Sequence, residues 1–456
     1  MGKKVWLVVL MAALLCPLLA GAGEVKSKYD VDFYGYVKLD AIYQMGYAFP
    51  GLDFILNAPP GNYVGFPNNA AYGSATSTIR RPRGDEQENR DADAFGMTAR
   101  QSRFGFLITG PQTDGGITTR ARLEMDFYGY DPGRKASSNQ DPIENSGELR
   151  LRRAYVEIMG DNWSVLAGNE WMVISPIFPM LTGNYPYGAD IGSLGYRTPQ
   201  IRLTGYALDK KLKLEVAFDN KLGDPEAFGF DVDTGRAFGA PAYEYGITYA
   251  SEGLMIAYTG HWAEEEIQST RRGNLGHFGE RVNSYSNNVS IKVPIGDAIA
   301  IGGEYFEGAN LDGWITGAQE NGWLMNRHGD IEPLHCSGGW ADIELKPMDN
   351  VKINGGWGLD DVSDNQLRLA TLKPGYYGMP GDLAITKNQM WFANVGYNVT
   401  SSTMITMEWL QVISEYENAT AKHVTAAAGG PGPGIPHRQF DNGVVNRYTL
   451  SFWYIF

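Results

Sequence analysis

The sequence predicts an all-β chain that folds as a transmembrane antiparallel β-barrel of about 16 strands, with short turns at one end and long loops at the other. Stretches of about ten residues with alternating polarity recur along the chain, separated by polar connections that are alternately short and long. The 456 residues include 57 glycines, 26 tyrosines, 19 phenylalanines and 11 tryptophans, a composition that suits strands and turns. After residue 22, no uncharged apolar run approaches the ~18 residues of a spanning helix.

Residues 1–22 have the three parts of a secretory signal peptide. Lys3 and Lys4 give a basic start, residues 5–19 form an apolar run, and Ala20-Gly21-Ala22 supplies small residues at a cleavage site. The run is shorter than the ~20 residues that a membrane-anchor helix needs. Processing is expected to leave residues 23–456 as one barrel domain. Its one cysteine, Cys336, could form no internal disulfide.

The clearest strand lies at 117–128, where apolar residues from Ile117 to Phe127 share one face and charged residues from Arg120 to Asp126 share the other. A strand of a soluble β-sandwich could show the same pattern. The segment 448–456, YTLSFWYIF, favours the membrane barrel, because it places large apolar groups on one face up to Phe456. We interpret Phe456 as the assembly signal that the barrel-assembly machinery reads in outer-membrane barrels.

The predicted strands alternate strictly between short turns and long loops. They are expected at 31–43, 95–109, 117–128, 148–160, 162–172, 199–208, 211–220, 241–251, 253–263, 284–294, 297–308, 336–347, 350–360, 387–399, 403–416 and 443–456. An even number of strands closes the sheet and puts both chain ends at the short-turn end, which is periplasmic in bacterial outer membranes. The long loops are then extracellular.

The inward face of the second to sixth strands is rich in arginine. The candidate pore-lining residues are Lys38 on the first strand and Arg103, Arg120, Arg122, Arg150, Arg152, Arg153 and Arg202. Arg153 breaks the alternation and needs a β-bulge to point inward. Arginine stays charged and offers planar paired donors to a carboxylate, so a row of arginines suits a path for anions. The alternative is that these arginines pair with Glu124, Asp126, Glu157, Glu170 and Glu215 and brace the wall.

Two long loops have features that could shape a channel. The third loop, 173–198, is rich in proline and apolar residues, which suits a loop packed inside the barrel, although an external cap or a latch onto a neighbouring subunit fits equally well. In the first loop, 44–94, Arg80, Arg81 and Arg83 could attract anions to the mouth or contact lipopolysaccharide phosphates.

Four segments carry a family resemblance: FYGYVKLDAIY at 33–43, ARQSRFGF at 99–106, RLRRAYVE at 150–157 and LAGNEW at 166–171. Together they resemble the DcaP-like family of trimeric porins of Gram-negative outer membranes. The resemblance implies a homotrimer that takes up small anionic solutes passively, notably dicarboxylic acids, through an arginine-lined channel. It is specific in the first 170 residues, and the later half of the chain is only generally porin-like.

Other functions find less support in the sequence. The net charge of −14, which becomes −16 without the two lysines of residues 1–22, disfavours nucleic-acid binding. No hydrolase, metalloprotease or phosphate-loop motif occurs in a suitable context, so we expect neither an enzyme nor a cofactor. His328, His335 and Cys336 lack a fourth metal ligand, and no metal site is expected. A porin for neutral or cationic solutes and a plugged structural or adhesion barrel remain as alternatives.

Overall fold

The computed structural model describes residues 29–46, 49–50, 55–58, 93–129, 147–183, 191–220, 239–266, 281–314, 322–326, 328, 330–372, 385–416 and 442–456. The predicted signal peptide, 1–22, and the basic stretch Arg80, Arg81 and Arg83 lie outside the described residues. Within the described part, no helix is long and apolar enough to cross a membrane.

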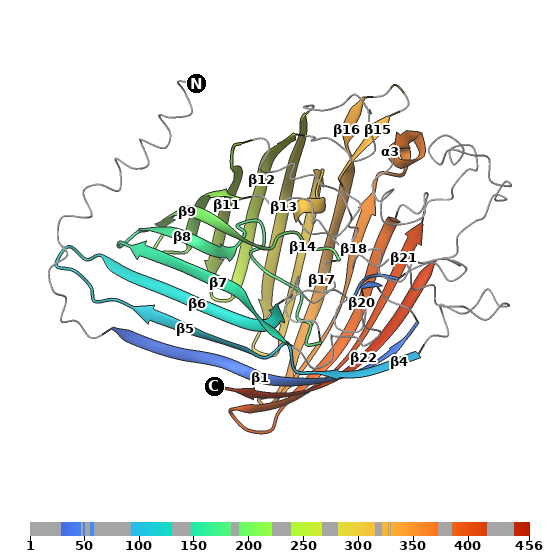
Figure 1. The fold of residues 1–456 in the computed structure, drawn as a ribbon. Coiled ribbons are helices and arrows are strands. Elements are labelled where there is room, and N and C mark those ends of the chain that lie inside the picture. The colour runs from blue at the N-terminus through green and yellow to red at the C-terminus, as the bar shows by residue number, and fades with distance from the viewer. Residues whose placement is uncertain are drawn as a thin grey trace, which may run out of the picture.

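Seventeen strands form one antiparallel sheet that closes on itself as a barrel (Figure 1). They are β1 (Asp30–Met45), β4 (Asp93–Thr98), β5 (Arg103–Thr109), β6 (Thr118–Gly129), β7 (Glu148–Met159), β8 (Trp163–Trp171), β9 (Arg197–Ala207), β10 (Leu212–Asp219), β11 (Ala242–Ser251), β12 (Leu254–Glu266), β13 (Arg281–Ile295), β14 (Ile299–Ala309), β17 (His335–Met348), β18 (Val351–Val362), β20 (Ile385–Asn398), β21 (Thr403–Tyr416) and β22 (Gly443–Ile455). β4 and β5 pair with the two halves of β1 and count as one wall strand, so the predicted barrel of sixteen is confirmed.

The first and last strands close the wall. β1 pairs with β22 from Tyr36 opposite Ile455 to Met45 opposite Asn446. At the very end, the Phe456 ring stacks on Phe33 at 5.0 Å between ring centres, and its backbone exchanges two hydrogen bonds with Gly35. The closed wall leaves no free sheet edge there. The role of Phe456 as an assembly signal stays a prediction.

The side chains of the wall alternate between an apolar outer face and a polar inner face. On β1, Val37 is 58% exposed on the outer face, whereas Lys38 and Asp40 are enclosed on the inner face. This alternation is typical of a barrel with lipid outside and a polar interior, and it is the reason that the sequence pattern located the strands.

The inside of the barrel holds the third long loop, which is one of the placements considered for it in the sequence analysis. The described parts of the segment between β8 and β9, residues 172–183 and 191–196 and here called the inner loop, lie against the inside of the sheet (Figure 1). With residues from η4 (Asp312–Trp314), β15 (Trp323–Asn326) and α3 (Asp364–Leu369), it builds an apolar cluster around the buried Ile174, Leu194 and Trp314.

Further short elements lie in regions that we predicted as loops. β15 pairs with β16 (Ile331–Pro333) and β19 (Ala370–Leu372) in a separate sheet, and β2 (Phe49–Pro50) pairs with β3 (Ile55–Asn57). Two or three paired residues are too few to show a period in the sequence.

Candidate functional site

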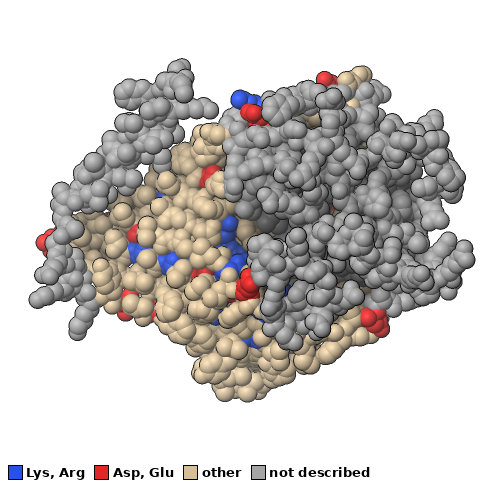
Figure 2. Space-filling model, viewed as in Figure 1, with Lys and Arg blue, Asp and Glu red and all other residues tan. Residues whose placement is uncertain are grey.

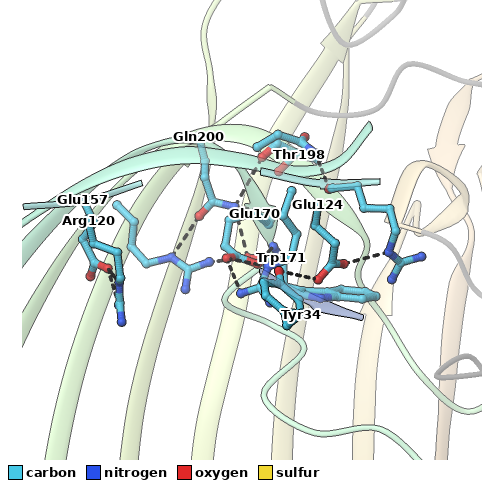
Figure 3. Close-up of polar contacts among 12 residues, drawn as sticks. Tyr34, Arg120, Glu124, Glu157, Glu170, Trp171, Thr198 and Gln200 are labelled. Carbon is cyan, nitrogen blue, oxygen red and sulfur yellow. Dashed lines mark hydrogen bonds and ion pairs between the residues drawn. The ribbon is translucent and has the colours of Figure 1, made fainter. Parts of the chain in front are cut away.

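The predicted arginines lie together on the inner face of β5 to β9 and define what we call the arginine wall. Most of them are held by carboxylates of β6, β7, β8 and β10, and Figure 3 shows several of these contacts. The ion pairs are Arg120–Glu157 at 2.5 Å, Arg150–Asp126 at 2.6 Å, Arg152–Glu124 at 2.8 Å, Arg152–Asp126 at 2.9 Å, Arg153–Glu170 at 2.5 Å and Arg202–Glu215 at 3.3 Å. The bracing contacts considered in the sequence analysis are therefore present, with all five of the expected acids.

A bulge in β7 sets the two adjacent arginines apart. Glu124 pairs in register with Arg153, but the next residue, Met125, pairs with Leu151, so Arg152 is the extra residue. Arg153 consequently points inward, as its predicted bulge required, and Arg152 is only 2% exposed. Because it bridges two carboxylates while fully enclosed, Arg152 braces the wall rather than facing an open path.

Arg122 differs from its neighbours because its guanidinium forms no ion pair with any residue that the structure describes. It lies over the ring of Tyr34, with 5.3 Å between the guanidinium carbon and the ring centre. Its Nε–H is buried and donates to no partner within the described ranges. Tyr34 in turn donates a hydrogen bond to Glu124 at 3.0 Å (Figure 3). The guanidinium is thus oriented without being neutralised.

A glycine makes this arrangement possible. Tyr34 on β1 reaches β6 by lying across Gly105 of β5, where an added Cβ would sit 2.7 Å from the tyrosine ring. Any larger residue at this position would displace the ring that supports Arg122.

The arginine wall carries an excess of positive charge. Arg103 lies 3.9 Å from Glu124, a carboxylate that already binds Arg152, and stacks over Tyr36. The seven arginines of the wall face five carboxylates, which leaves a formal excess of two positive charges. On the visible described surface of the molecule, basic and acidic side chains are interspersed (Figure 2).

The wall extends along the barrel axis. β6 starts after the short connection at 110–117, so Arg120 lies near the short-turn end and Asp126 near the long-loop end, about 20 Å away at ~3.3 Å per residue. Beyond Asp126, Arg197 stacks over Trp171 at 4.9 Å. Burial would raise the pKa of the nearby Tyr196 phenol, but the charges of Arg197, Arg150 and Arg152 hold that pKa below its ordinary value.

The opposite side of the barrel interior is acidic, but its carboxylates bind the inner loop. Glu244 of β11 accepts the backbone N–H of Ile174 at 2.9 Å, and Asp360 of β18 accepts that of Gly192 at 3.1 Å. Asp342 and Glu408 act in the same way on residues 180–183. These contacts confirm that the inner loop folds inside the barrel. They also explain how an acidic chain keeps a basic wall, because these four acids are covered by the loop.

Comparison with known proteins agrees with this architecture. Neither a family model nor a curated protein sequence matches the chain. Among solved structures, it is similar to the outer-membrane channel DcaP of Acinetobacter baumannii, with 18% identity over 96% of this chain and 100% of that one and a TM-score of 0.65. The chain has the porin fold.

Two further porins align over almost the whole chain. The anion-selective porin from Comamonas acidovorans shares 11% identity over 94% of this chain and 100% of that one, with a TM-score of 0.52. The OmpF of Salmonella typhi, solved in complex with daunomycin, shares 11% identity over 93% and 97% of the two chains, with a TM-score of 0.51.

Lys38 has a different position in the porin barrel from the arginines. It points inward, as predicted, but its side chain is fully enclosed beneath the inner loop. Its Nζ lies 2.9 Å from Asp40 and donates a hydrogen bond to the carbonyl of Thr182 at 2.6 Å. Polarity along β1 does not predict this contact, because a loop residue 144 positions away provides it.

The described histidines do not form a metal centre in the porin barrel. His261 is buried, stacks on Trp314 and contacts Ser284 and Ser286. His335 contacts Tyr285. No three His, Cys, Asp or Glu side chains of the described residues are arranged to hold a metal ion.

Proposed function

We propose that this chain is an outer-membrane diffusion porin of a Gram-negative bacterium that passes small anionic solutes, such as dicarboxylates, between the arginine wall and the inner loop. The observation that carries the proposal is the guanidinium of Arg122, which is oriented by Tyr34 and has no ion-pair partner among the described residues. A barrel of this strand number is wide enough for an aqueous channel, and the side chains inside it decide which solutes pass.

The ion-paired arginines support the same proposal. Arg120 and Arg150 keep 35% and 31% of their side-chain surface exposed despite their carboxylate partners. Guanidinium groups with spare donors offer a carboxylate several weak sites in sequence, and weak sites allow a solute both to enter and to leave. Two carboxylates on one solute could contact two such groups at once.

The location and assembly state belong to the same proposal. The apolar outer face and the alternating C-terminal strand fit a lipid environment, and the resemblance of the first 170 residues to DcaP-like porins supports a homotrimer in the outer membrane. The described residues contain a wall of charged groups inside the barrel, which supports a channel.

A plugged structural barrel is the second candidate, because two apolar clusters occupy part of the barrel interior. One surrounds Ile174 and Trp314, and the other surrounds Leu181 and Ile191 of the inner loop. The alternative of a path for neutral or cationic solutes finds less support in the excess positive charge of the arginine wall.

Reconstitution in planar bilayers tests the proposal. The purified protein should give stepwise conductance, and its zero-current potential in a potassium chloride gradient should have the sign of anion preference. In liposomes, succinate should enter faster than a neutral sugar of similar size. A protein that inserts but carries no current would be a plugged barrel, and a cation-selective current would refute the anion path.

A further inference from the structure

The tip of the inner loop, residues 180–183, is held by side chains of the wall along both of its edges. The carbonyl of Met180 accepts hydrogen bonds from the amides of Asn354 at 2.8 Å and Asn394 at 2.7 Å. The N–H of Met180 donates to Asp342 at 3.2 Å. β17, β18 and β20 thus all contribute to one backbone position of the loop.

Thr182 and Gly183 of the same segment are bound by two different parts of the wall. Glu408 of β21 accepts the N–H groups of Thr182 at 2.5 Å and Gly183 at 3.0 Å. From β1, Lys38 donates to the carbonyl of Thr182, and Gln101 donates to the carbonyl of Gly183 at 3.3 Å. Thr182 and Gly183 are therefore bound through their N–H groups by β21 and through their carbonyls by β1 and the residues before β5.

The interruption between β4 and β5 provides the second of these donors. Within residues 99–102, the Ser102 hydroxyl accepts the N–H of Lys38 at 2.9 Å and donates to the carbonyl of Lys38 at 3.2 Å. This contact docks the irregular segment on β1 and places Gln101 inside the barrel, where its carbonyl oxygen accepts a hydrogen bond from Lys38 Nζ. The interruption between β4 and β5 thus brings the Gln101 side chain beside Lys38, where both donate to the carbonyls of the loop tip.

We propose that Lys38, Gln101 and Glu408 are positioning residues that latch the tip of the inner loop and thereby set the width of the solute path. This inference rests on the proposed porin function. It assigns Lys38 a role different from that of the arginines, because an enclosed ammonium group paired with Asp40 controls the loop and does not meet the solute. Pore width and ion preference are then determined by separate groups.

Two variants release the latch on opposite edges. Lys38→Met removes the donor to Thr182, and Glu408→Gln replaces one of the two acceptor oxygens by an amide that faces the loop N–H groups. Each variant should show higher single-channel conductance than the wild type and should admit polyethylene glycols that the wild type excludes. Lys292→Met is the matched control, since Lys292 is an inward lysine that pairs with Glu344 on the wall at 2.5 Å. It should leave conductance and polymer exclusion unchanged.

A reversible cross-link provides a readout that a merely structural role would not change. A Cβ at position 183 would lie 3.3 Å from Cβ of Thr449 on β22, close to the ~3.5–4.5 Å range of disulfides. The same Cβ would lie 2.7 Å from the carboxylate oxygen of Glu408 that accepts the N–H of Gly183, so the flexible Glu408 side chain must shift and the disulfide takes over its hold on the loop. Gly183→Cys with Thr449→Cys should therefore tie the loop tip to the wall when oxidised.

The triple variant Lys38→Met, Gly183→Cys, Thr449→Cys should show the wild-type conductance and polymer cut-off when oxidised, and the wide pore after reduction. The double cysteine variant alone should also show the wild-type conductance and polymer cut-off when oxidised. If Lys38→Met changes ion preference but leaves polymer exclusion at the wild-type size, Lys38 is a pore-lining charge and the latch is refuted. A wild-type protein without conductance would refute the porin function itself, so the two failures are distinguishable.

Discussion

Arg122→Gln should reduce anion preference more than any charge-neutral change in the arginine wall. The side chain lies over Tyr34, and no carboxylate of the described residues pairs with it. Glutamine keeps much of the side-chain length and polarity, so the variant removes one positive charge with little change in the width of the channel. The expected effect is therefore electrostatic.

The size of the effect follows from the separation between the guanidinium and a passing ion. At about 5 Å in water, one unit charge attracts an anion by about 0.8 kcal/mol, and a Debye length of ~10 Å in 0.1 M salt reduces this to about 0.5 kcal/mol. The same charge repels a cation equally, so its loss should lower the anion-to-cation permeability ratio by about 1 kcal/mol, or about fivefold. A lower effective dielectric constant beside the wall would enlarge this change.

The assay is the zero-current potential in a potassium chloride gradient across a planar bilayer. The matched control is the double variant Arg120→Gln, Glu157→Gln, which removes an ion pair of the same wall without changing its net charge. It should keep the wild-type potential. The reasoning is refuted if Arg122→Gln leaves the potential unchanged, or if the neutral double variant shifts it by as much.

Three further changes test other parts of the structure. Arg152→Met should lower the free energy of unfolding by ~3–5 kcal/mol, because it leaves two enclosed carboxylates without their shared partner, and denaturant titration in detergent measures this loss. Phe456→Asp should lower the outer-membrane yield while secretion across the inner membrane stays normal, as cell fractionation would show; wild-type insertion would exclude an assembly signal. Gly105→Ala should displace the Tyr34 ring and lower the melting temperature, whereas Gly205→Ala, where an added Cβ meets nothing within 4 Å, should have a smaller effect.

The barrel could be predicted from the sequence because its determinants are local. A strand with lipid on one side and polar groups on the other must alternate, so each strand carries its own signature, and the strands from 117–128 to 443–456 were located within a few residues. The same alternation predicted that Arg103, Arg120, Arg122, Arg150 and Arg202 point inward. Even the bulge at Arg152 and Arg153 was visible, because it breaks the alternation of β7.

The roles of those inward side chains were decided only by the tertiary structure. Arg120 and Arg122 are indistinguishable in the pattern of β6, yet one meets Glu157 from β7 and the other meets Tyr34 from β1. Lys38 reads like any inward charge until a loop residue 144 positions away lies over it. The alternation of polar and apolar residues along a strand is a property of that segment alone, so it can be read from the sequence. The pairing, enclosure and remaining charge of an inward group depend on residues distant in sequence, and only the closed barrel with its inner loop brings them together.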